Sequence, residues 1–422
     1  MRRALNILEQ SINERGWLAQ ASVWEVDSGA GNGSPYLKRA LKPDANVQVM
    51  CYEDEIAQSD EFSRFFEALK QEFAAQGELE WMRRPVAYPD EKKACLRNLV
   101  RPALVAYVKE SFIENYGFAD MDTSRAIAVL EDLLLGLKNE LITYRAIAPL
   151  VDLSGPGDEI KVDDCLALCP LNTNTVLEIL NTCGADLGNF YLRWHHSLKC
   201  AYAFVYTYEV AWGSPTVPNV DLIRDALSAL RVLKAGDVDV PLVYARPDSA
   251  RLTNCLGFVA WAPLFTKPFG QSRYLLSIED VPLLKQVYMR IRRLPPSARE
   301  RIALDRLNMV YERLRPQDQL IDSWVGLEAL LNIESEIRFR TALRLAFYLG
   351  NDANDREKLY TAALATYDAR SRTVHGRRVD DPQAKADQAV ELLRRCLRKA
   401  LLDGLPNWIE FDKRQIVVGG GA

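Results

Sequence analysis

The fold of the C-terminal third can be inferred first from residues 384–403, which read AKADQAVELLRRCLRKALLD. Apolar residues recur in this stretch at spacings of three and four, the period of an amphipathic helix with one buried face. They are Ala389, Val390, Leu393, Cys396, Leu397, Ala400 and Leu401. Gly404 follows the last of them and suits the end of a helix. The stretch therefore predicts a helix that buries one face against other helices.

Four similar patterns precede this helix, each with an apolar stripe along one face. They cover residues 298–314, 317–332, 335–349 and 354–375. The connections between them are short, which favours antiparallel neighbours in an up-and-down bundle. Pro295 and Pro296 mark a boundary before the first of them. We therefore expect four or five packed helices over residues 296–404, followed by a C-terminal tail at 405–422.

Residues 1–150 mix strand and helix patterns and are expected to form an N-terminal α/β-mixed region of unassigned fold. The expected strands are 22–26 and 46–50, and the expected helices are 59–76, 91–115 and 123–148. The glycine-rich loop 28–35 lacks the Gly-Lys-Ser/Thr ending of a phosphate-binding loop. We therefore interpret this loop as a simple connection.

Residues 151–295 are expected to form a middle region of the α+β class, a candidate sensor or regulatory part. Its expected elements are a buried strand at 201–210, a helix capped by Asn219 that runs to about residue 235, and an edge strand at 257–265. Pro263 places the last strand at an edge, because proline cannot donate to a neighbouring strand. The chain as a whole is therefore expected to be α+β, with an all-α bundle at its C-terminal end.

The composition is that of a folded globular protein, since 48% of the 422 residues are hydrophobic and 26% are charged. This length favours two or three domains. Eight scattered cysteines lack the density of a disulfide scaffold, so reduced thiols are expected. Residues 1–17 lack the apolar centre of a signal peptide, and no apolar run of about 18 residues predicts a membrane span. We therefore expect a cytoplasmic protein with no membrane partner.

Cysteine and histidine residues gather in one part of the middle region. They are Cys165, Cys169, Cys183, His195, His196 and Cys200. Three apolar residues separate the first two, which differs from the tight spacing of common zinc-binding pairs. Plain buried thiols are the simpler interpretation, so we expect neither a metal nor another cofactor.

Although the net charge is −4, the stretch between residues 286 and 315 is basic, because it contains eight arginines and only three acidic residues. We call this stretch the basic strip. Whole-chain charge does not exclude binding to nucleic acid. Two interpretations of the strip stay open: the arginines contact phosphates, or they pair with nearby acids on solvent-exposed helix faces.

The chain contains only three histidines, His195, His196 and His375. His375 ends the predicted helix 354–375, directly before Gly376, which readily adopts the left-handed backbone that closes a helix. Its ring is therefore expected near an open helix end, where it can reach a ligand.

Arg370 lies five positions before His375, and Tyr367, Ser371 and His375 share one stripe of the helix. An arginine is permanently charged and its planar group matches phosphate oxygens, whereas histidine exchanges protons near neutral pH. RNA can be cleaved by attack of its own 2′-hydroxyl on the adjacent phosphorus. That reaction needs a base, an acid and a cation, and no metal. The two residues are expected to flank one phosphate.

The run 367–376, Tyr-Asp-Ala-Arg-Ser-Arg-Thr-Val-His-Gly, resembles the Tyr-x-x-Arg-Ser-x-x-Val-His-Gly signature of the Apea-like branch of the HEPN superfamily. Residues 318–331 resemble the family's helix with a Leu-Glu-Ala-Leu core, and residues 340–346 resemble its next helix. The resemblance covers residues 296–404. Ser371 stands where the wider superfamily often has Asn, Asp or His, although serine is usual in this branch.

The resemblance implies a helical bundle that dimerises and brings two Arg-x4-His motifs together as one RNA-cleaving site. It implies a metal-independent endoribonuclease, toxin-like or antiviral in role, whose substrate is RNA, tRNA included. The implied catalytic residues are His375 for proton transfer, Arg370 as a phosphate clamp and Ser371 as an orienting or substrate-contacting group. The implied RNA-binding residues nearby are Arg372, Arg377 and Arg378.

Two further residues are expected to support this site. Glu328 lies among apolar helix residues, where a carboxylate needs a partner, and Arg344 is a candidate. Tyr367 is expected in the core, with its hydroxyl directed toward the site. Residues 1–290 are then expected to bind an unidentified trigger or to restrain the bundle. Two alternatives stay open: a catalytically silent bundle that binds RNA or dimerises, and an independent enzyme within residues 1–290.

Overall fold

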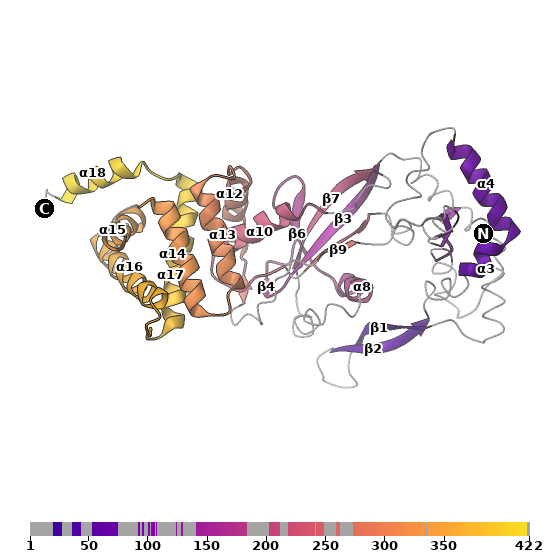
Figure 1. The fold of residues 1–422 in the computed structure, drawn as a ribbon, viewed down its shortest axis with the longest axis horizontal. Helices are drawn as coiled ribbons and strands as arrows, with labels where there is room; N and C mark the ends of the chain where they lie inside the picture. Colours follow the sequence, from indigo (N-terminus) through magenta and orange to yellow (C-terminus); the bar gives the residue numbers. More distant parts are fainter. Residues whose placement is uncertain are drawn as a thin grey trace.

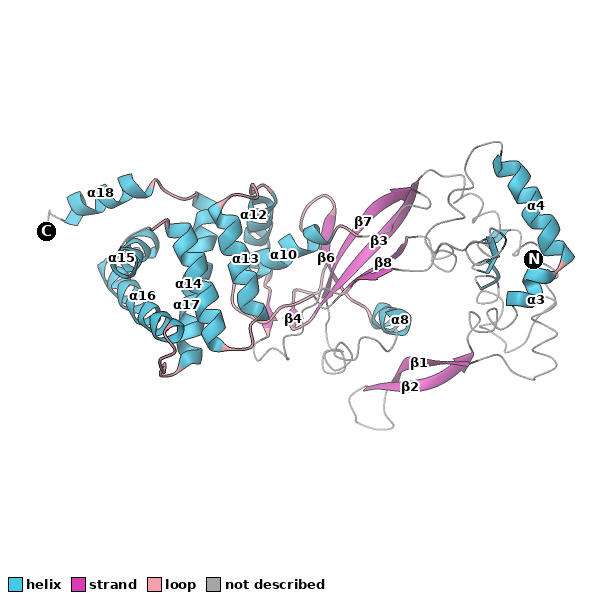
Figure 2. Ribbon diagram, viewed as in Figure 1, coloured by secondary structure: helices cyan, strands magenta, loops and turns pink. Residues whose placement is uncertain are grey.

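The computed structural model describes residues 20–27, 36–43, 53–74, 141–183, 202–211, 218–240, 242–248, 259–261, 273–333 and 336–419, with scattered positions between 92 and 129. The fold is α+β. Figure 1 shows a helical bundle at the C-terminal end, an antiparallel sheet in the middle and two helices, α3 and α4, beyond it. Figure 2 separates these parts by secondary structure.

The central sheet has six strands in the order β5-β6-β7-β3-β8-β9, and every neighbouring pair is antiparallel. The strands are β3 (Leu141–Leu150), β5 (Ile160–Lys161), β6 (Leu166–Pro170), β7 (Tyr202–Ala211), β8 (Val243–Pro247) and β9 (Val259–Trp261). The buried strand expected at 201–210 is confirmed as β7, where Phe204 is fully buried. The strand expected at 257–265 is confirmed in part as β9, which lies at the edge.

The expected helix 123–148 is wrong from residue 141 onward, because β3 occupies this part of the chain. Exposed and buried residues alternate at its start, where Ile142 and Tyr144 are buried and Thr143 is exposed. This two-residue period belongs to a strand with one covered face. β3 pairs with β7 over its whole length. The sheet therefore crosses the expected boundary after residue 150.

Helix α10 (Val220–Leu233) lies between the sheet and the bundle (Figure 1). Asn219 caps it by accepting a hydrogen bond from the backbone N–H of Asp221, as expected from the sequence. Its buried residues Ala229 and Leu230 belong to the same apolar core as Ala146 of β3. The sheet and the helical bundle are therefore joined through this helix.

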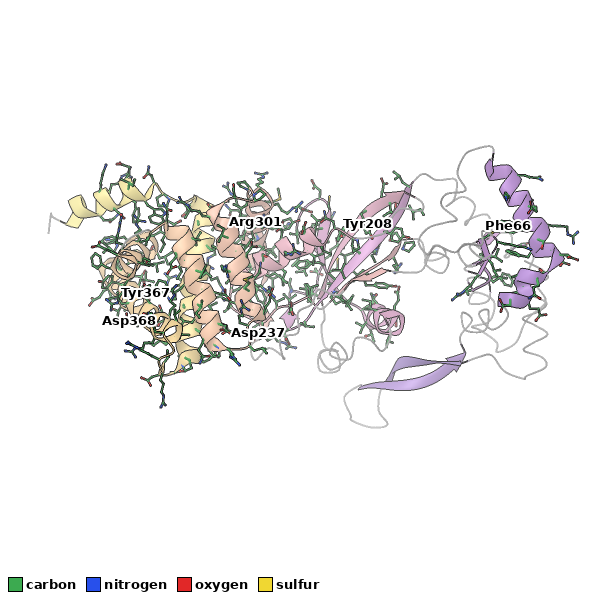
Figure 3. The ribbon with its side chains drawn as sticks, in the orientation of Figure 1. Phe66, Tyr208, Asp237, Arg301, Tyr367 and Asp368 are labelled. Carbon is green, nitrogen blue, oxygen red and sulfur yellow. The ribbon has the colours of Figure 1, made fainter. Side chains whose placement is uncertain are left out.

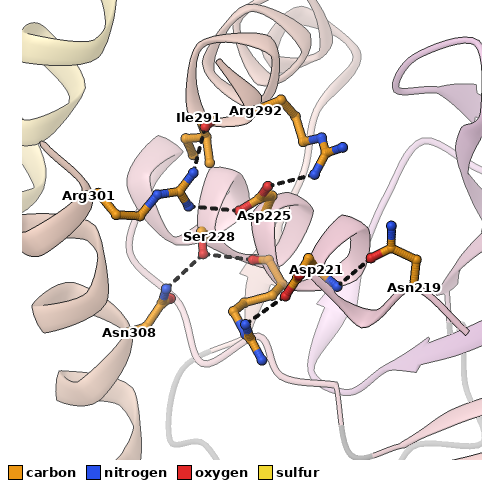
Figure 4. A network of polar contacts seen from close by, with 9 residues as sticks. Asn219, Asp221, Asp225, Ser228, Ile291, Arg292, Arg301 and Asn308 are labelled. Atoms are coloured by element: carbon orange, nitrogen blue, oxygen red, sulfur yellow. Dashed lines mark hydrogen bonds and ion pairs between the residues drawn. The ribbon is translucent and has the colours of Figure 1, made fainter. Parts of the chain in front are cut away.

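A polar network ties α10 to the next two helices, α12 (Val281–Arg292) and α13 (Arg299–Glu312) (Figure 4). The buried carboxylate of Asp225 accepts hydrogen bonds from Arg292 at 3.1 Å and from Arg301 at 3.0 Å. Asn308 of α13 donates to the Ser228 hydroxyl of α10 at 2.8 Å. The helical structure is interrupted at Pro295 and Pro296, but these hydrogen bonds join the helices on the two sides of the interruption.

The predicted helices of the bundle are confirmed to within three residues. They are α13, α14 (Pro316–Leu331), α15 (Ile337–Leu349), α16 (Ala353–Val374) and α17 (Pro382–Asp403). Helix α17 packs against α13, α14 and α16, and its residues Ala389, Leu393 and Leu397 are fully buried. The three-and-four spacing of apolar residues thus identifies the buried face correctly.

The expected C-terminal tail contains a further helix, α18 (Trp408–Gly419), at the end of the bundle in Figure 1. Trp408 is 4% exposed and its indole N–H donates to the carbonyl oxygen of Leu330 at 3.0 Å. Its ring also meets Tyr348 and Phe411 edge-on. The segment 405–422 is therefore not only a tail, since most of it forms a helix that packs on the bundle.

The N-terminal region contains a hairpin of β1 (Gln20–Asp27) and β2 (Tyr36–Pro43) and the helices α3 (Glu53–Gln58) and α4 (Asp60–Ala74). The strand expected at 22–26 and the helix expected at 59–76 are confirmed. The loop 28–35 and the strand expected at 46–50 lie outside the described residues, and 91–115 is described only at scattered positions. Among the described residues, no helix is long and apolar enough to cross a membrane.

Candidate functional site

The helix that carries the motif, α16, ends in a hydrogen-bonded cap at Gly376. Gly376 has a φ of +65°, and its N–H donates to the carbonyl of Thr373 at 3.0 Å. The N–H of Arg377 donates to the carbonyl of Arg372 at 2.8 Å. These two bonds form the Schellman motif that commonly closes helices. The expected helix stop is confirmed, and exposed His375 is the last residue before the turn.

The guanidinium of Arg370 is half-buried between α16 and α14. Its Nη2 atom lies 3.7 Å from Oε1 of Glu328, and the two side chains are 24% and 25% exposed. The guanidinium carbon also lies 5.9 Å from the ring centroid of Tyr367, one turn earlier on α16. Arg370 therefore faces a carboxylate and an aromatic ring, and part of its surface stays open to solvent.

Arg344, the candidate partner of Glu328, does not pair with it. Arg344 instead binds Asp412 of α18 and the carbonyl oxygen of Leu331. Glu328 and Arg344 lie on different helices, and spacing along the sequence cannot decide which arginine reaches which acid. The partner of Glu328 is Arg370, the residue that the motif assigns to the phosphate.

The electrostatics of Glu328 reflect this position. Burial raises the pKa of its carboxyl, and the positive charge of Arg370 opposes that rise. Glu328 Oε1 and Arg370 Nε are both buried atoms without a hydrogen-bond partner in the described structure. The two groups therefore attract each other without a formed hydrogen bond, a costly arrangement for buried polar atoms.

Tyr367 supports this junction from the core side. Its ring meets Trp324 of α14 edge-on, with 5.1 Å between the ring centroids, and Trp324 is fully buried. Figure 3 labels Tyr367 and its neighbour Asp368 on α16. Asp368 is held by Arg338 of α15 through bonds of 2.6 and 2.8 Å. The expected core position of Tyr367 agrees with its partial burial against the apolar core.

The C-terminal end of α16 gathers the other residues that the motif singled out. Ser371 is half-buried, whereas Arg372, His375, Arg377 and Arg378 are exposed. Val374 is 53% exposed beside them. The structure thus places a cluster of cationic groups, an imidazole and one apolar side chain at a single open helix end, where they can meet an anion.

The basic strip at 286–315 divides into two groups. Four of its eight arginines pair with buried acids: Arg292 and Arg301 with Asp225, and Arg306 and Arg313 with Asp322. Another four, Arg290, Arg293, Arg299 and Arg315, are exposed. For half of the strip, pairing with acids within the fold is therefore the correct interpretation.

The cysteine and histidine cluster of the middle region is only partly described. Cys165 is an exposed free thiol, and burial raises the pKa of Cys169 to about 11. His195, His196 and Cys200 lie outside the described residues, as does the side chain of Cys183. Among the side chains that the structure describes, no three His, Cys, Asp or Glu residues gather as a metal site requires. The expectation of a metal-free protein stays a prediction.

Comparisons with protein-family models, with curated proteins and with solved structures found no match. The resemblance of residues 296–404 to the HEPN superfamily therefore stays a prediction. The geometry places a cationic group that can bind a phosphate, the guanidinium of Arg370, on the helix that the exposed imidazole of His375 caps.

Proposed function

We propose that this protein is a metal-independent endoribonuclease of the HEPN type. The observation that supports this proposal most directly is that Arg370 lies near the end of α16 and His375 caps the same helix. The guanidinium is partly open and the imidazole is exposed. Both belong to a part of the chain that is a bundle of helices. The exposed arginines 372, 377 and 378 supply further sites for phosphates on either side of the cleaved bond.

In this mechanism the 2′-hydroxyl oxygen of the RNA attacks the adjacent phosphorus, and the bond to the 5′-oxygen breaks. One imidazole accepts the proton of the 2′-hydroxyl, and a protonated imidazole gives a proton to the leaving oxygen. Arg370 stabilises the negative charge that builds on the phosphate oxygens. The products are a 2′,3′-cyclic phosphate and a free 5′-hydroxyl.

A composite site made by two chains fits the helix geometry better than a site within one chain. Residues five apart on a helix lie about 7.5 Å apart along the axis and about 140° apart around it. Arg370 also points toward Glu328 of α14, whereas His375 lies on the exposed end of α16. We infer that His375 of one copy acts beside Arg370 of another, with exposed Val374 in the contact between them.

The remainder of the chain then regulates this activity. The central sheet shares its core with the bundle through α10, so an event at the sheet can reach the helices that hold the motif. We propose that residues 1–290 bind a trigger that releases or assembles the ribonuclease, in a toxin-like or antiviral role. Cellular RNA, tRNA included, is the proposed substrate, and the cytoplasm is the proposed location.

The direct test is cleavage of total cellular RNA, tRNA included, in EDTA. Wild-type protein is compared with His375→Ala, Arg370→Ala and a control, Arg414→Ala, which removes an exposed arginine of α18. We expect cleavage by the wild type and the control, with 2′,3′-cyclic phosphate ends, and none by the two motif variants.

Two outcomes would contradict the proposal. Strict dependence on Mg²⁺ would exclude the mechanism. RNA binding by wild-type protein without cleavage at any trigger or concentration would favour the catalytically silent module instead. Sedimentation of the active protein tests the dimer, since a strictly monomeric active enzyme excludes a composite site.

A further inference from the structure

The ion pair between Glu328 and Arg370 differs from the other arginine pairs of the bundle. Arg338 binds Asp368 through two short bonds of 2.6 and 2.8 Å. Arg344 binds Asp412 in the same two-point manner, at 2.9 and 2.6 Å. Glu328 and Arg370 stay 3.7 Å apart. The carboxylate therefore attracts the guanidinium but leaves its N–H donors uncommitted.

Both members of this pair lack the hydrogen bonds that their burial calls for. Oε1 of Glu328 and Nε of Arg370 are buried, and no group in the described structure bonds to either. Among the described residues, the charge of Arg370 is what counteracts the effect of burial on the pKa of the Glu328 carboxyl. An oxyanion that approached the guanidinium from its open side could bond to the exposed part of the group, because phosphate oxygens match its geometry, whereas the buried Nε would stay without a partner.

We propose that Glu328 is an internal counter-anion of Arg370, and that a phosphate of the RNA competes with it for the guanidinium. This inference rests on the proposed function, since it takes RNA phosphate as the ligand of Arg370. Glu328 is then a positioning residue. It holds the charged side chain at the junction of α14 and α16 when no RNA is bound, and it lowers RNA affinity because its charge repels the incoming phosphate.

If Glu328 competes with RNA in this way, removing its charge changes RNA affinity in the opposite direction from removing a residue that only supports the fold. Removing a residue that merely supports the fold weakens binding, whereas removing a competing anion strengthens it. The neutral isostere Glu328→Gln keeps the shape of the side chain and deletes its charge. The gain in RNA affinity must also depend on Arg370, because the Glu328 carboxylate and the RNA phosphate compete only for its guanidinium.

The test is a double-mutant cycle on the full chain. Binding of a 2′-O-methyl oligoribonucleotide, which lacks the attacking hydroxyl, is measured by fluorescence anisotropy for wild type, Glu328→Gln, Arg370→Gln and the double variant. We expect Glu328→Gln to tighten binding about two- to fivefold, the range set by a partly exposed charge pair. In the Arg370→Gln background we expect no gain.

Asp368→Asn is the matched control, because it removes one negative charge from α16 without touching Arg370. Its effect on affinity is expected to be the same with and without Arg370. If Glu328→Gln fails to unfold cooperatively, Glu328→Leu replaces it in the cycle, since leucine suits a half-buried helix position.

The outcomes separate this inference from the proposed function. Weaker or unchanged binding by Glu328→Gln, or an equal gain in the absence of Arg370, would overturn the inference alone. Absence of RNA binding by the wild type would overturn both. Tighter binding that disappears with Arg370 would support the counter-anion.

Discussion

Arg344 of α15 and Asp412 of α18 form a two-point ion pair, with Nε to Oδ1 at 2.9 Å and Nη2 to Oδ2 at 2.6 Å. Arg344 is 4% exposed, and its guanidinium carbon lies 5.1 Å from the ring centroid of Trp408. Arg340 reaches the same carboxylate at 3.1 Å. Two arginines of α15 thus hold the last helix against the bundle that carries the motif.

Replacing Asp412 with asparagine should destabilise the bundle, because it leaves the buried charge of Arg344 without its counter-charge. Breaking a fully buried pair costs about 3–5 kcal/mol. Asp412 is 29% exposed, so we expect a loss of about 2 kcal/mol in the free energy of unfolding. Urea denaturation measures this loss. Lys413→Ala, an exposed neighbour, is the control, and equal stability of both variants would contradict the expectation.

The same substitution should alter the dependence of stability on pH. The hydrogen bond from Arg344 lowers the pKa of Asp412 below its ordinary value of 3.8, against the effect of burial. A group with a lowered pKa contributes stability above its ordinary value and loses that contribution as the pH falls through the folded-state pKa. Wild type should therefore lose more stability than Asp412→Asn in unfolding experiments below about pH 4.

A fragment that begins at Pro296 should not fold cooperatively. The buried Arg394 of α17 donates to the carbonyl oxygen of Arg231 at 2.9 Å, and Arg398 donates to that of Leu233 at 2.7 Å. Both acceptors lie in α10, so the fragment 296–422 deprives the buried guanidinium of Arg394 of one acceptor and uncovers apolar core.

Calorimetry of two fragments checks this point. We expect 218–422, which retains α10 and α12, to show a cooperative transition that 296–422 lacks. A sharp transition in the shorter fragment would show that the bundle is an independent domain.

The helices of the bundle could be predicted from the sequence because their apolar spacing is long and regular. Five helices between 299 and 403 lie within three residues of their expected bounds. The strand β3 was missed because its start, Leu141-Ile142-Thr143-Tyr144, follows an apolar helix-like run, and a short alternation is hard to separate from such a run. Helix α18 was missed because tertiary contacts, through Trp408 and Asp412, stabilise it more than its own pattern does.

The candidate site shows the same division between local and long-range information. The helix stop at Gly376 and the exposure of His375 follow from local sequence, and both were predicted. The partner of Glu328 depends on how α14 crosses α16, which no local pattern contains. The sequence therefore singled out both Glu328 and Arg370 as candidate site residues, but it did not predict that the two face each other.

Glu328→Gln should also become more favourable relative to wild type as the pH rises. Burial raises the pKa of this carboxyl. A group with a raised pKa contributes stability fully below its ordinary value of 4.5 and loses it as the pH rises through the folded-state pKa. Glutamine does not titrate, so the variant does not lose stability in this way. We expect the free energy of unfolding of the variant to rise relative to that of wild type as the pH increases above about 4. Denaturant unfolding at several pH values measures the gain, and a difference that shrinks with pH would refute it.

Gly376→Ala should both destabilise α16 and disturb the motif. Gly376 has a φ of +65°, and a Cβ built there meets no atom within 4 Å, so backbone strain is the only cost. The left-handed conformation costs an alanine about 1 kcal/mol. Gly376→Asn should cost less, because asparagine tolerates this region.

Thermal unfolding and RNA cleavage are measured on both variants. We expect stability and cleavage to fall together, and to fall further for Gly376→Ala than for Gly376→Asn, since the turn at 376 fixes the residue that caps the helix, His375. If Gly376→Ala lost stability but kept full cleavage, the position of His375 would not depend on this helix end, and the catalytic role proposed for the motif would lose its structural basis.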